Sequence, residues 1–359
     1  MAHREYSYNG IKSVHFEPTT RCNLDCPMCP RTVHGGWVNP MLPITELDLA
    51  QVKQIFPQDF IRQIDKFYMC GNYGEPIVAR DTLEIFQWLK SINSTIQLGL
   101  HTNGSARNTE WWRELALCFS GPNDHVIFGI DGLEDTNHLY RKGANWNKVM
   151  SNAQTYISSG GKNSCWTFIA FRHNEHQIEQ AQRLSTKLNF TKFITKKTSR
   201  FINPTTGEYI TDYPVFDSQG ETVYWLQQPD NQKLRNTSVQ EIAQSTERAA
   251  FLNETQINCK IIREKSIFVS AEALVFPCCW TASIYNYPGG QKQQQLYKLL
   301  DGNYENLSLF KRSLKSIVDG KYFDRIFASW NMPAISQGKL LHCADNCSKV
   351  IDRFSDQFR

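Results

Sequence analysis

Three cysteines lie within eight residues near the start of the chain. The stretch RCNLDCPMCPR, residues 21–31, places Cys22, Cys26 and Cys29 at C-x3-C-x2-C spacing. Closely spaced thiolates in a loop bind a metal ion or an iron–sulfur cluster. A closed zinc site needs four ligands and the local count is three, whereas a triplet on a four-iron cube leaves one iron open. The spacing therefore favours a cluster over zinc, and over three unrelated buried cysteines.

A second group of cysteines lies in the last third of the chain and consists of Cys259, Cys278, Cys279, Cys343 and Cys347. The chain has 11 cysteines, an odd number, gathered near both ends. This distribution indicates metal or cluster ligation rather than disulfides. Three others, Cys70, Cys118 and Cys165, are predicted to be buried apolar residues. Cys70 directly precedes GNYGEP and is also a candidate hydrogen donor in an active site.

The composition indicates a globular protein without a membrane span. Hydrophobic residues make up 41% of the 359 residues, charged residues 21%, and the net charge is +4. The start, MAHREYSYNGIKSVHFEP, lacks the apolar core of a secretory signal, so we expect the reducing cytoplasm. Lysine and arginine are scattered, so nucleic acid is not required as a partner, and TKKTSR is interpreted as solvated surface.

Short apolar runs alternate with amphipathic segments of helical period from about residue 12 to residue 200. The candidate strands are Ser13–Pro18, Lys66–Met69, Ile96–His101, His125–Ile130, Cys165–Phe171 and Phe190–Thr195. The candidate helices include 82–92 and 175–188. Strict alternation predicts right-handed crossovers and a parallel sheet, either open or curled into a partial barrel. Both versions place the active site at the carboxyl ends of the strands.

Unusual residues follow the candidate strands in agreement with this rule. The cysteine triplet follows the first strand, CGNYGEP the second, HTNGS the third, DGLEDTNHLYRKG the fourth and RHN the fifth. These segments are predicted to meet at one rim. Beyond residue 200 the alternation stops, which predicts a unit over 1–200, a mostly irregular connector over 201–250 and a second unit over 251–359.

The cysteine triplet after the first strand, followed by Gly-Glu-Pro after the second, resembles the radical S-adenosylmethionine (SAM) superfamily over residues 12 to about 195. The resemblance implies an α/β fold, a partial (β/α)6 TIM-like barrel. It implies a 4Fe-4S cluster on Cys22, Cys26 and Cys29. It also implies reductive cleavage of S-adenosylmethionine to a 5′-deoxyadenosyl radical that abstracts hydrogen from the substrate.

The same resemblance implies contacts to S-adenosylmethionine. The segment of Gly74, Glu75 and Pro76 would receive the methionyl amino group, and Arg141 the carboxylate, unless Arg141 is a solvated helix residue. Asn103 and Gly104 would contact the ribose, unless they form a simple turn. The backbone of Met28 would contact adenine, at a position where the family commonly has an aromatic residue. Asp131 is placed near the substrate or closes the turn; with Cys70, it is a weak catalytic candidate.

The second cysteine group resembles the auxiliary-cluster extension called SPASM, or its short form called twitch. In both, a cysteine and a β-hairpin, here predicted over residues 266–276, precede another cysteine and a distant cysteine pair. Ala273 stands where the family has glycine, and CADNC is C-x3-C rather than C-x2-C. Five cysteines rather than seven imply one auxiliary 4Fe-4S cluster. Its implied ligands are Cys259, Cys278, Cys343 and Cys347, with Cys279 a bystander or substitute; a structural zinc site on the same four is the alternative.

The resemblance implies a radical SAM oxidoreductase of the dehydrogenase or peptide-modifying type. Its substrate would be a small molecule or a peptide, and its electron donor a reductase such as flavodoxin or ferredoxin. The alternative is a non-catalytic iron–sulfur or zinc protein that binds RNA or a protein partner. Gly74 and Glu75 separate the two, because a structural cluster has no need of an amine-binding carboxylate.

Overall fold

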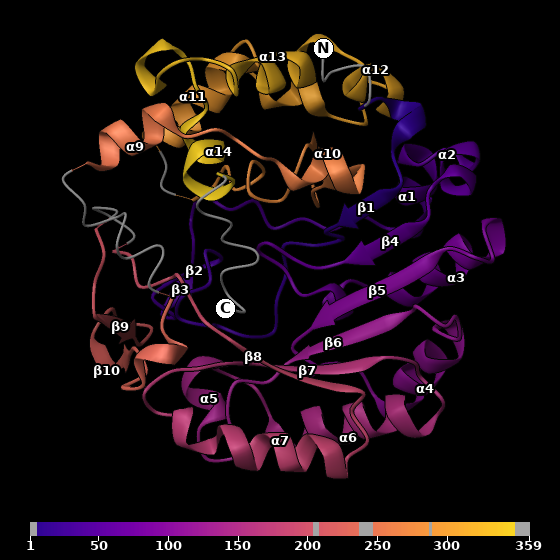
Figure 1. Cartoon of the computed structure of the whole chain (residues 1–359). Helices are drawn as coiled ribbons and strands as arrows, with labels where there is room; N and C mark the ends of the chain where they lie inside the picture. The colour runs from indigo at the N-terminus through magenta and orange to yellow at the C-terminus, as the bar shows by residue number, and fades with distance from the viewer. Residues whose placement is uncertain (1–5, 204–207, 237–246, 287–288, 349–359) are drawn as a thin grey trace.

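A curved eight-stranded sheet forms the centre of the molecule (Figure 1). The computed structural model describes residues 6–203, 208–236, 247–286 and 289–348. The strands have the order β12-β11-β1-β4-β5-β6-β7-β8. The six parallel strands are β1 (Ser13–Phe16), β4 (Lys66–Met69), β5 (Gln97–Thr102), β6 (His125–Gly129), β7 (Ser164–Ile169) and β8 (Lys192–Lys196). The prediction of a partial parallel barrel over these strands is confirmed.

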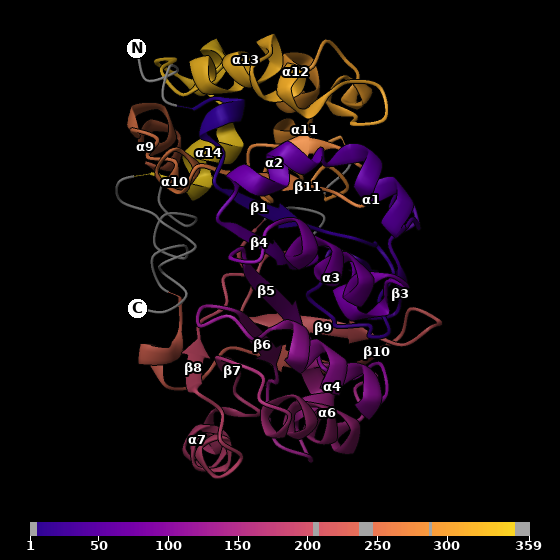
Figure 2. The same cartoon turned by 90° about the vertical axis from the view of Figure 1, so that its right-hand side faces the viewer.

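Helices pack on the convex face of this sheet (Figures 1 and 2). They are α1 (Leu49–Ile55), α2 (Gln58–Gln63), α3 (Thr82–Ile92), α4 (Thr109–Cys118), α6 (Trp146–Ser158) and α7 (Ile178–Lys187). The short helix α5 (Asn137–Tyr140) lies instead in the segment after β6, where Tyr140 packs with Met28. The predicted helix over 82–92 is confirmed, and Leu83, Phe86 and Leu89 are buried on one face of it. The predicted helix over 175–188 begins as a 3-10 turn, η4 (Glu175–Gln177), and continues as α7.

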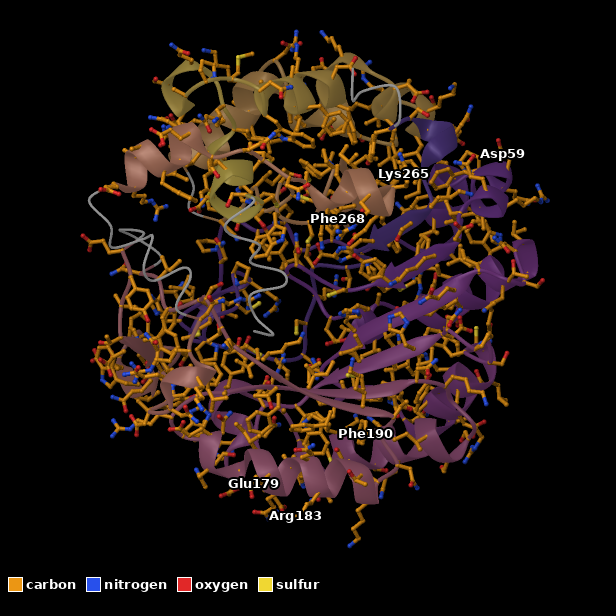
Figure 3. All side chains as sticks on the ribbon, viewed as in Figure 1. Asp59, Glu179, Arg183, Phe190, Lys265 and Phe268 are labelled. Atoms are coloured by element: carbon orange, nitrogen blue, oxygen red, sulfur yellow. The ribbon has the colours of Figure 1, made fainter. Side chains whose placement is uncertain are left out.

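The two faces of the parallel strands carry different side chains. Phe67, Leu98 and Phe128 are fully buried in the core. Alternate positions carry rings that contact one another across strands: His15 stacks on Tyr68 at 4.6 Å and meets Phe268 at 4.7 Å. Figure 3 shows Phe268 facing the middle of the molecule. The period of two in each strand therefore separates an apolar outer face from a polar and aromatic inner face.

The predicted hairpin over 266–276 is confirmed as β11 (Ser266–Val269) and β12 (Val275–Phe276). It does not stand apart from the barrel, because β11 pairs in parallel with β1, with Ser13 opposite Ser266. The helices that accompany it are α9 (Arg248–Glu254), α10 (Lys260–Glu264), α11 (Gln291–Leu299), α12 (Leu314–Val318), α13 (Lys321–Ser329) and α14 (Leu341–Asn346). The domain boundaries themselves stay a prediction.

The prediction of a mostly irregular connector over 201–250 is wrong for its first half. There β9 (Asp212–Phe216) and β10 (Thr222–Gln227) form an antiparallel ribbon. Tyr213, Val215 and Leu226 bury the inner side of this ribbon against Met28, and this long-range packing stabilises the strands where local composition indicated none. Residues 204–207 and 237–246 of the connector, and 349–359 of the predicted auxiliary domain, lie outside the described residues.

A short hairpin directly follows the cysteine triplet and consists of β2 (Thr32–Val33) and β3 (Trp37–Val38). It contacts the ribbon, because Phe216 N donates a hydrogen bond to His34 O at 2.9 Å.

No helix in the described part of the chain combines the length and the apolar character that crossing a bilayer requires.

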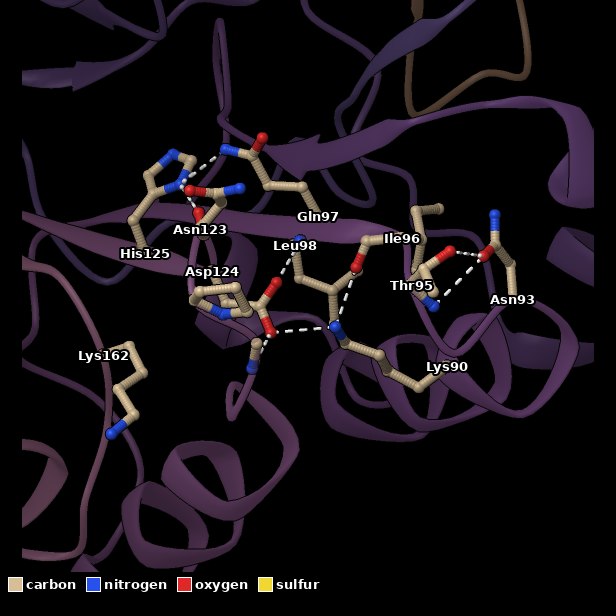
Figure 4. A network of polar contacts seen from close by, with 12 residues as sticks. Lys90, Asn93, Thr95, Ile96, Gln97, Leu98, Asn123, Asp124, His125 and Lys162 are labelled. Atoms are coloured by element: carbon tan, nitrogen blue, oxygen red, sulfur yellow. Dashed lines mark hydrogen bonds and ion pairs between the residues drawn. The ribbon is translucent and has the colours of Figure 1, made fainter.

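A buried ion pair joins the amino ends of two strands (Figure 4). Lys90 of α3 lies 2.9 Å from Asp124, whose side chain is 1% exposed. The same carboxylate accepts hydrogen bonds from Leu98 N at 2.7 Å and Gly121 N at 2.8 Å. This network connects α3, β5 and the residue before β6, so it holds the end of the barrel opposite the site.

We expect Asp124→Ala to lower the free energy of unfolding by about 3–5 kcal/mol, because it leaves the partly buried ammonium of Lys90 without its ionic partner and two backbone N–H groups without their acceptor. Urea unfolding of the anaerobically purified protein measures this. The control is Glu179→Ala, which removes an exposed pair with Arg183 on α7 (Figure 3) and is expected to cost less than about 1 kcal/mol. Equal effects of the two variants would contradict a locking role for Asp124.

Ala273, at the position where the resemblance predicts glycine, has a φ of 58° in the turn between β11 and β12. A left-handed backbone costs an alanine roughly 1 kcal/mol that glycine does not pay. We therefore expect Ala273→Gly to raise the free energy of unfolding by up to about 1 kcal/mol. Glycine also increases the conformational entropy of the unfolded chain, which offsets part of this gain. Ala271→Gly, equally buried in the same turn but without a positive φ, should destabilise the protein. Destabilisation by both variants would show that the turn carries no strain.

Candidate active site

The cysteine triplet occupies a compact loop after β1. Cys26 is 9% exposed, and Cys22 and Cys29 are half-buried. The loop is closed by hydrogen bonds from Cys29 N at 3.0 Å and from Thr32 Oγ1 at 2.8 Å, both to Cys26 O. Burial raises the pKa of the Cys26 thiol to about 11 against the lowering effect of Arg141, and the charge of Cys29 adds to the rise. The thiols therefore lie close enough to influence one another.

These thiols are the donor type that iron–sulfur clusters use. Within the ranges that the structure describes, no three His, Cys, Asp or Glu side chains are arranged around one point for a single metal ion. A four-iron cube binds each thiolate at a different iron, so it does not require the sulfur atoms to converge. The donor set fits a cube with three protein ligands.

Arg31, directly after the triplet, holds the loop from inside. It is 8% exposed and donates to Thr20 O at 3.3 Å, Leu24 O at 3.4 Å and the carboxylate of Asp25 at 3.3 Å. At Gly35 a Cβ would lie 2.9 Å from Asp25 O, so the following turn packs directly on this loop. Sequence reasoning assigned no role to Arg31, although its position beside the last cysteine was a signal.

The predicted amine-binding segment follows β4 and lies against the triplet loop. At Gly74 a Cβ would lie 1.8 Å from Thr19 O, so only glycine permits this approach. The Glu75 carboxylate is 5% exposed and accepts from Asn103 N at 2.7 Å. Burial raises the pKa of Glu75 to about 7, and burial followed by the charge of Glu75 raises the pKa of the Cys22 thiol. Pro76 is buried and begins the 3-10 turn that follows.

Glu17 supports this segment and was not found from the sequence. Its side chain is 1% exposed, and its Oε1 accepts from Tyr73 N at 2.7 Å and Gly74 N at 3.0 Å. Burial raises the pKa of Glu17 to about 7 despite these hydrogen bonds. The available signal was a carboxylate directly after the first strand, before the triplet.

The predicted ribose-binding turn follows β5. Asn103 Nδ2 donates to Asn23 Oδ1 at 3.0 Å, and Asn103 Oδ1 accepts from Ser105 N at 2.8 Å. Gly104 has a φ of 71° and its carbonyl accepts from Asn152 at 2.8 Å. The side-chain amide of Asn103 therefore ties the turn to the triplet loop, and a ribose contact stays a prediction.

Arg141 reaches the triplet from the end of α5. Its Nε donates to Asp131 Oδ2 at 2.6 Å, and its side chain also forms a hydrogen bond with Cys26. Asp131 is fully buried, and its other oxygen accepts from Ile169 N at 2.6 Å. At Gly129 a Cβ would lie 2.4 Å from Arg141 Nη2, so the absence of a side chain makes room for the guanidinium. Asp131 thus joins the turn after β6 to β7 and orients Arg141, and a catalytic role of Asp131 stays a prediction.

Met28 and Cys70 lie near this site in different ways. Met28 buries its side chain against the ribbon, and its carbonyl accepts from Arg200 Nη1 at 3.3 Å. Cys70 follows β4, its carbonyl bonds His15 Nε2 at 2.6 Å, and burial raises the pKa of its thiol to about 12. An adenine contact of Met28 and a hydrogen-donor role of Cys70 stay predictions.

Four cysteines of the second group lie close enough for their thiols to shift one another's pKa. The pKa of the Cys259 thiol is raised by a hydrogen bond with Cys347, by burial, and by the charges of Cys278, Cys343 and Cys347. Burial and the charges of Cys278 and Cys347 raise the pKa of Cys343. The four thiols that the sequence assigned to an auxiliary cluster are therefore neighbours, contributed by the start of α10, the segment after β12, and α14.

Cys279 has different neighbours from Cys278. Burial, then Cys278, and more weakly Cys70 raise the pKa of Cys279, and burial followed by Cys279 and Cys70 raises the pKa of Tyr68. The Cys279 carbonyl accepts from Asn72 Nδ2 at 2.8 Å. Cys279 thus neighbours the inner face of the barrel, where Tyr68 and Cys70 lie.

Residues 16–184 match the family model described as the Radical SAM superfamily. The fold resembles SuiB of Streptococcus suis bound to the precursor peptide SuiA, with a TM-score of 0.55 and 12% identity over 95% of this chain and 73% of that chain. It also resembles anSMEcpe with bound AdoMet and Kp18Cys peptide, with a TM-score of 0.53 and 14% identity over 94% and 89%. At such identities the likeness concerns the fold alone.

The chain therefore contains a radical SAM domain with its partial barrel. The match of this domain supports a radical SAM enzyme, and the family implies a 4Fe-4S cluster and S-adenosylmethionine. The chain spans 60% of the length of the SuiB chain bound to S-adenosylmethionine, so its particular reaction, substrate and partners are matters of proposal.

The raised pKa of Glu17 predicts a pH-dependent difference between the wild type and Glu17→Gln, in which Gln can still accept both backbone hydrogen bonds. The folded protein holds a proton that the unfolded chain releases between the ordinary pKa of 4.5 and about 7. The stabilising contribution of Glu17 is complete below the lower value and is lost as the pH rises through the upper one. We expect the wild type to lose on the order of 3 kcal/mol relative to the variant across this window.

Urea unfolding of both proteins at several pH values measures this loss, with Glu179→Gln as the exposed control. A difference between wild type and Glu17→Gln that stays flat, or that favours the wild type more as the pH rises, would contradict the buried, proton-binding Glu17.

Proposed function

We propose that this enzyme cleaves S-adenosylmethionine reductively at Cys22, Cys26 and Cys29, and that the 5′-deoxyadenosyl radical abstracts hydrogen from a peptide or small-molecule substrate. The bound cluster supplies the electron and the open iron that this cleavage requires. An external reductase such as flavodoxin or ferredoxin delivers the electron. The chain's own residues bind, orient and shield the reacting groups.

One observation carries the proposal: an anion and a cation flank the triplet. The negative charge of Glu75 raises the pKa of the Cys22 thiol, and the Arg141 side chain forms a hydrogen bond with Cys26. The methionyl end of S-adenosylmethionine carries an ammonium and a carboxylate, which match these two charges. Glu75 holds the ammonium and thereby stays ionised, while Arg141, already oriented by Asp131, holds the carboxylate.

The four neighbouring thiols Cys259, Cys278, Cys343 and Cys347 support an auxiliary cluster that accepts an electron from the substrate radical or binds the substrate. Cys278 is the preferred ligand over Cys279, because the charge of Cys278 raises the pKa of the Cys259 and Cys343 thiols. The pKa of Cys279 is instead raised in part by Cys70. A peptide is the leading substrate class, since SuiB and anSMEcpe are both described with bound peptides. The dehydrogenation of a small molecule is the second candidate.

Formation of 5′-deoxyadenosine tests the proposal. The protein is reconstituted anaerobically with iron and sulfide, reduced with dithionite in the presence of S-adenosylmethionine, and the product is measured by chromatography. We expect product from the wild type and a loss of at least about 100-fold in Cys26→Ala, because the cube loses a ligand. Glu75→Gln should raise the KM for S-adenosylmethionine roughly tenfold through the lost charge-assisted contact.

Cys118→Ala, on α4 outside the site, is the control and should retain wild-type product formation. If the wild type forms no 5′-deoxyadenosine and binds zinc tightly without iron–sulfur absorbance, the non-catalytic alternative is the better description.

A further inference from the structure

The loop that carries Glu75 contacts the loop that carries Cys278. Asn72 Nδ2 donates to Cys279 O at 2.8 Å, and Tyr285 N donates to Tyr73 OH at 3.3 Å. The rings of Tyr73 and Tyr285 meet edge to face, with centroids 5.8 Å apart. Residues separated by more than 200 positions in the sequence thus connect the S-adenosylmethionine side of the molecule with the auxiliary side.

Further hydrogen bonds hold the two loops on either side of this contact. On one side Glu17 holds Tyr73 N and Gly74 N. On the other side Tyr285 OH donates to Glu272 at 2.6 Å, and Tyr285 O accepts from Asn39 Nδ2 at 3.1 Å. A cavity of only about 10 Å³, lined by residues of both loops, lies beside the two tyrosines, so there is room for about one water molecule.

The Glu75 loop is too tightly folded to absorb a displacement at one end. At Gly71 a Cβ would lie 1.9 Å from Gly74 O, and at Gly74 a Cβ would lie 1.8 Å from Thr19 O. Close-packed segments transmit a shift instead of deforming locally. A movement of Asn72 or Tyr73 is therefore passed to Glu75, which lies two or three residues further along the chain.

We propose that Asn72 and Tyr73 couple the two sites, so that filling the auxiliary site tightens the binding of S-adenosylmethionine. Ligation of Cys278 fixes the position of its neighbour Cys279, whose carbonyl holds Asn72. Asn72 and Tyr73 in turn hold Glu75 in the position that receives the ammonium. The coupling is reciprocal, so S-adenosylmethionine also alters the surroundings of the auxiliary cluster. Asn72 and Tyr73 are positioning residues, and the inference rests on the proposed function.

A thermodynamic cycle measures this coupling through binding, without turnover. The dissociation constant of S-adenosylmethionine is determined by anaerobic equilibrium dialysis on four reconstituted proteins. They are the wild type, Asn72→Ala, Cys343→Ala/Cys347→Ala and the triple variant. Loss of the auxiliary ligands should weaken binding about fivefold to tenfold in the wild-type background and less than twofold in the Asn72→Ala background. Iron content and the electron paramagnetic resonance (EPR) signal of the remaining cluster confirm that the first site is filled.

Asn93→Ala provides the matched control, because Asn93 caps the carbonyls of Ile61 and Ile64 away from both loops. In that background the full effect should remain. Equal weakening with and without Asn72 would overturn the inference while leaving the proposed function intact. A wild type that binds no S-adenosylmethionine would instead refute the proposed function.

A second measurement does not depend on the folding of the cysteine variants. In the intact wild type, S-adenosylmethionine should shift the EPR signal of the reduced auxiliary cluster, and Asn72→Ala should abolish that shift while retaining both clusters. The absence of a shift in the wild type, or its persistence in Asn72→Ala, would overturn the coupling.

Discussion

Buried carboxylates at the carboxyl edge of the sheet constrain the whole site. Glu17, Glu75 and Asp131 are at most 5% exposed, and an ionised carboxylate in such surroundings is costly unless hydrogen bonds compensate it. Each accepts from a backbone N–H near the carboxyl end of the adjacent strand. Glu17 after β1 bonds the loop after β4, Glu75 after β4 bonds Asn103 after β5, and Asp131 after β6 bonds Ile169 at the end of β7. The carboxylates thereby join successive loops around the rim.

The same arrangement explains why the auxiliary cysteines lie where they do. Strand β1 is hydrogen-bonded to β4 on one side and to β11 on the other. The triplet loop thus follows a strand with two partners, and the chain after β12 turns back along β11, because β12 is antiparallel to it. Asn72 and Tyr73 bridge the small remaining distance. The segments that carry the two sets of cysteines are thus attached to one continuous sheet.

Much of this architecture could be predicted from the sequence. The six parallel strands, α3 and the hairpin of β11 and β12 each carry a local hydrophobic period. The ribbon of β9 and β10 was missed because Pro214 interrupts the apolar pattern beside Val215, charged residues lie between Val215 and Leu226, and the buried residues find their partners on distant loops. Arg31 and Glu17 were missed for a related reason: their hydrogen-bond partners are carbonyls and N–H groups of irregular backbone, which no residue pattern encodes.

The spacing of residues along the chain and the periods of helix and strand are local properties. For that reason the sequence alone was sufficient to predict the cysteine triplet, the order of strands and helices, and the rim at which the motifs meet. Contacts between remote segments depend on how loops turn and pack, and only the three-dimensional structure decided them. Cys278 and Cys279 are adjacent and chemically identical, yet one neighbours the other auxiliary thiols and the other neighbours Cys70. Likewise, the residue type of Asp131 did not indicate its partners, and the structure shows its carboxylate bonded to Arg141 Nε and Ile169 N.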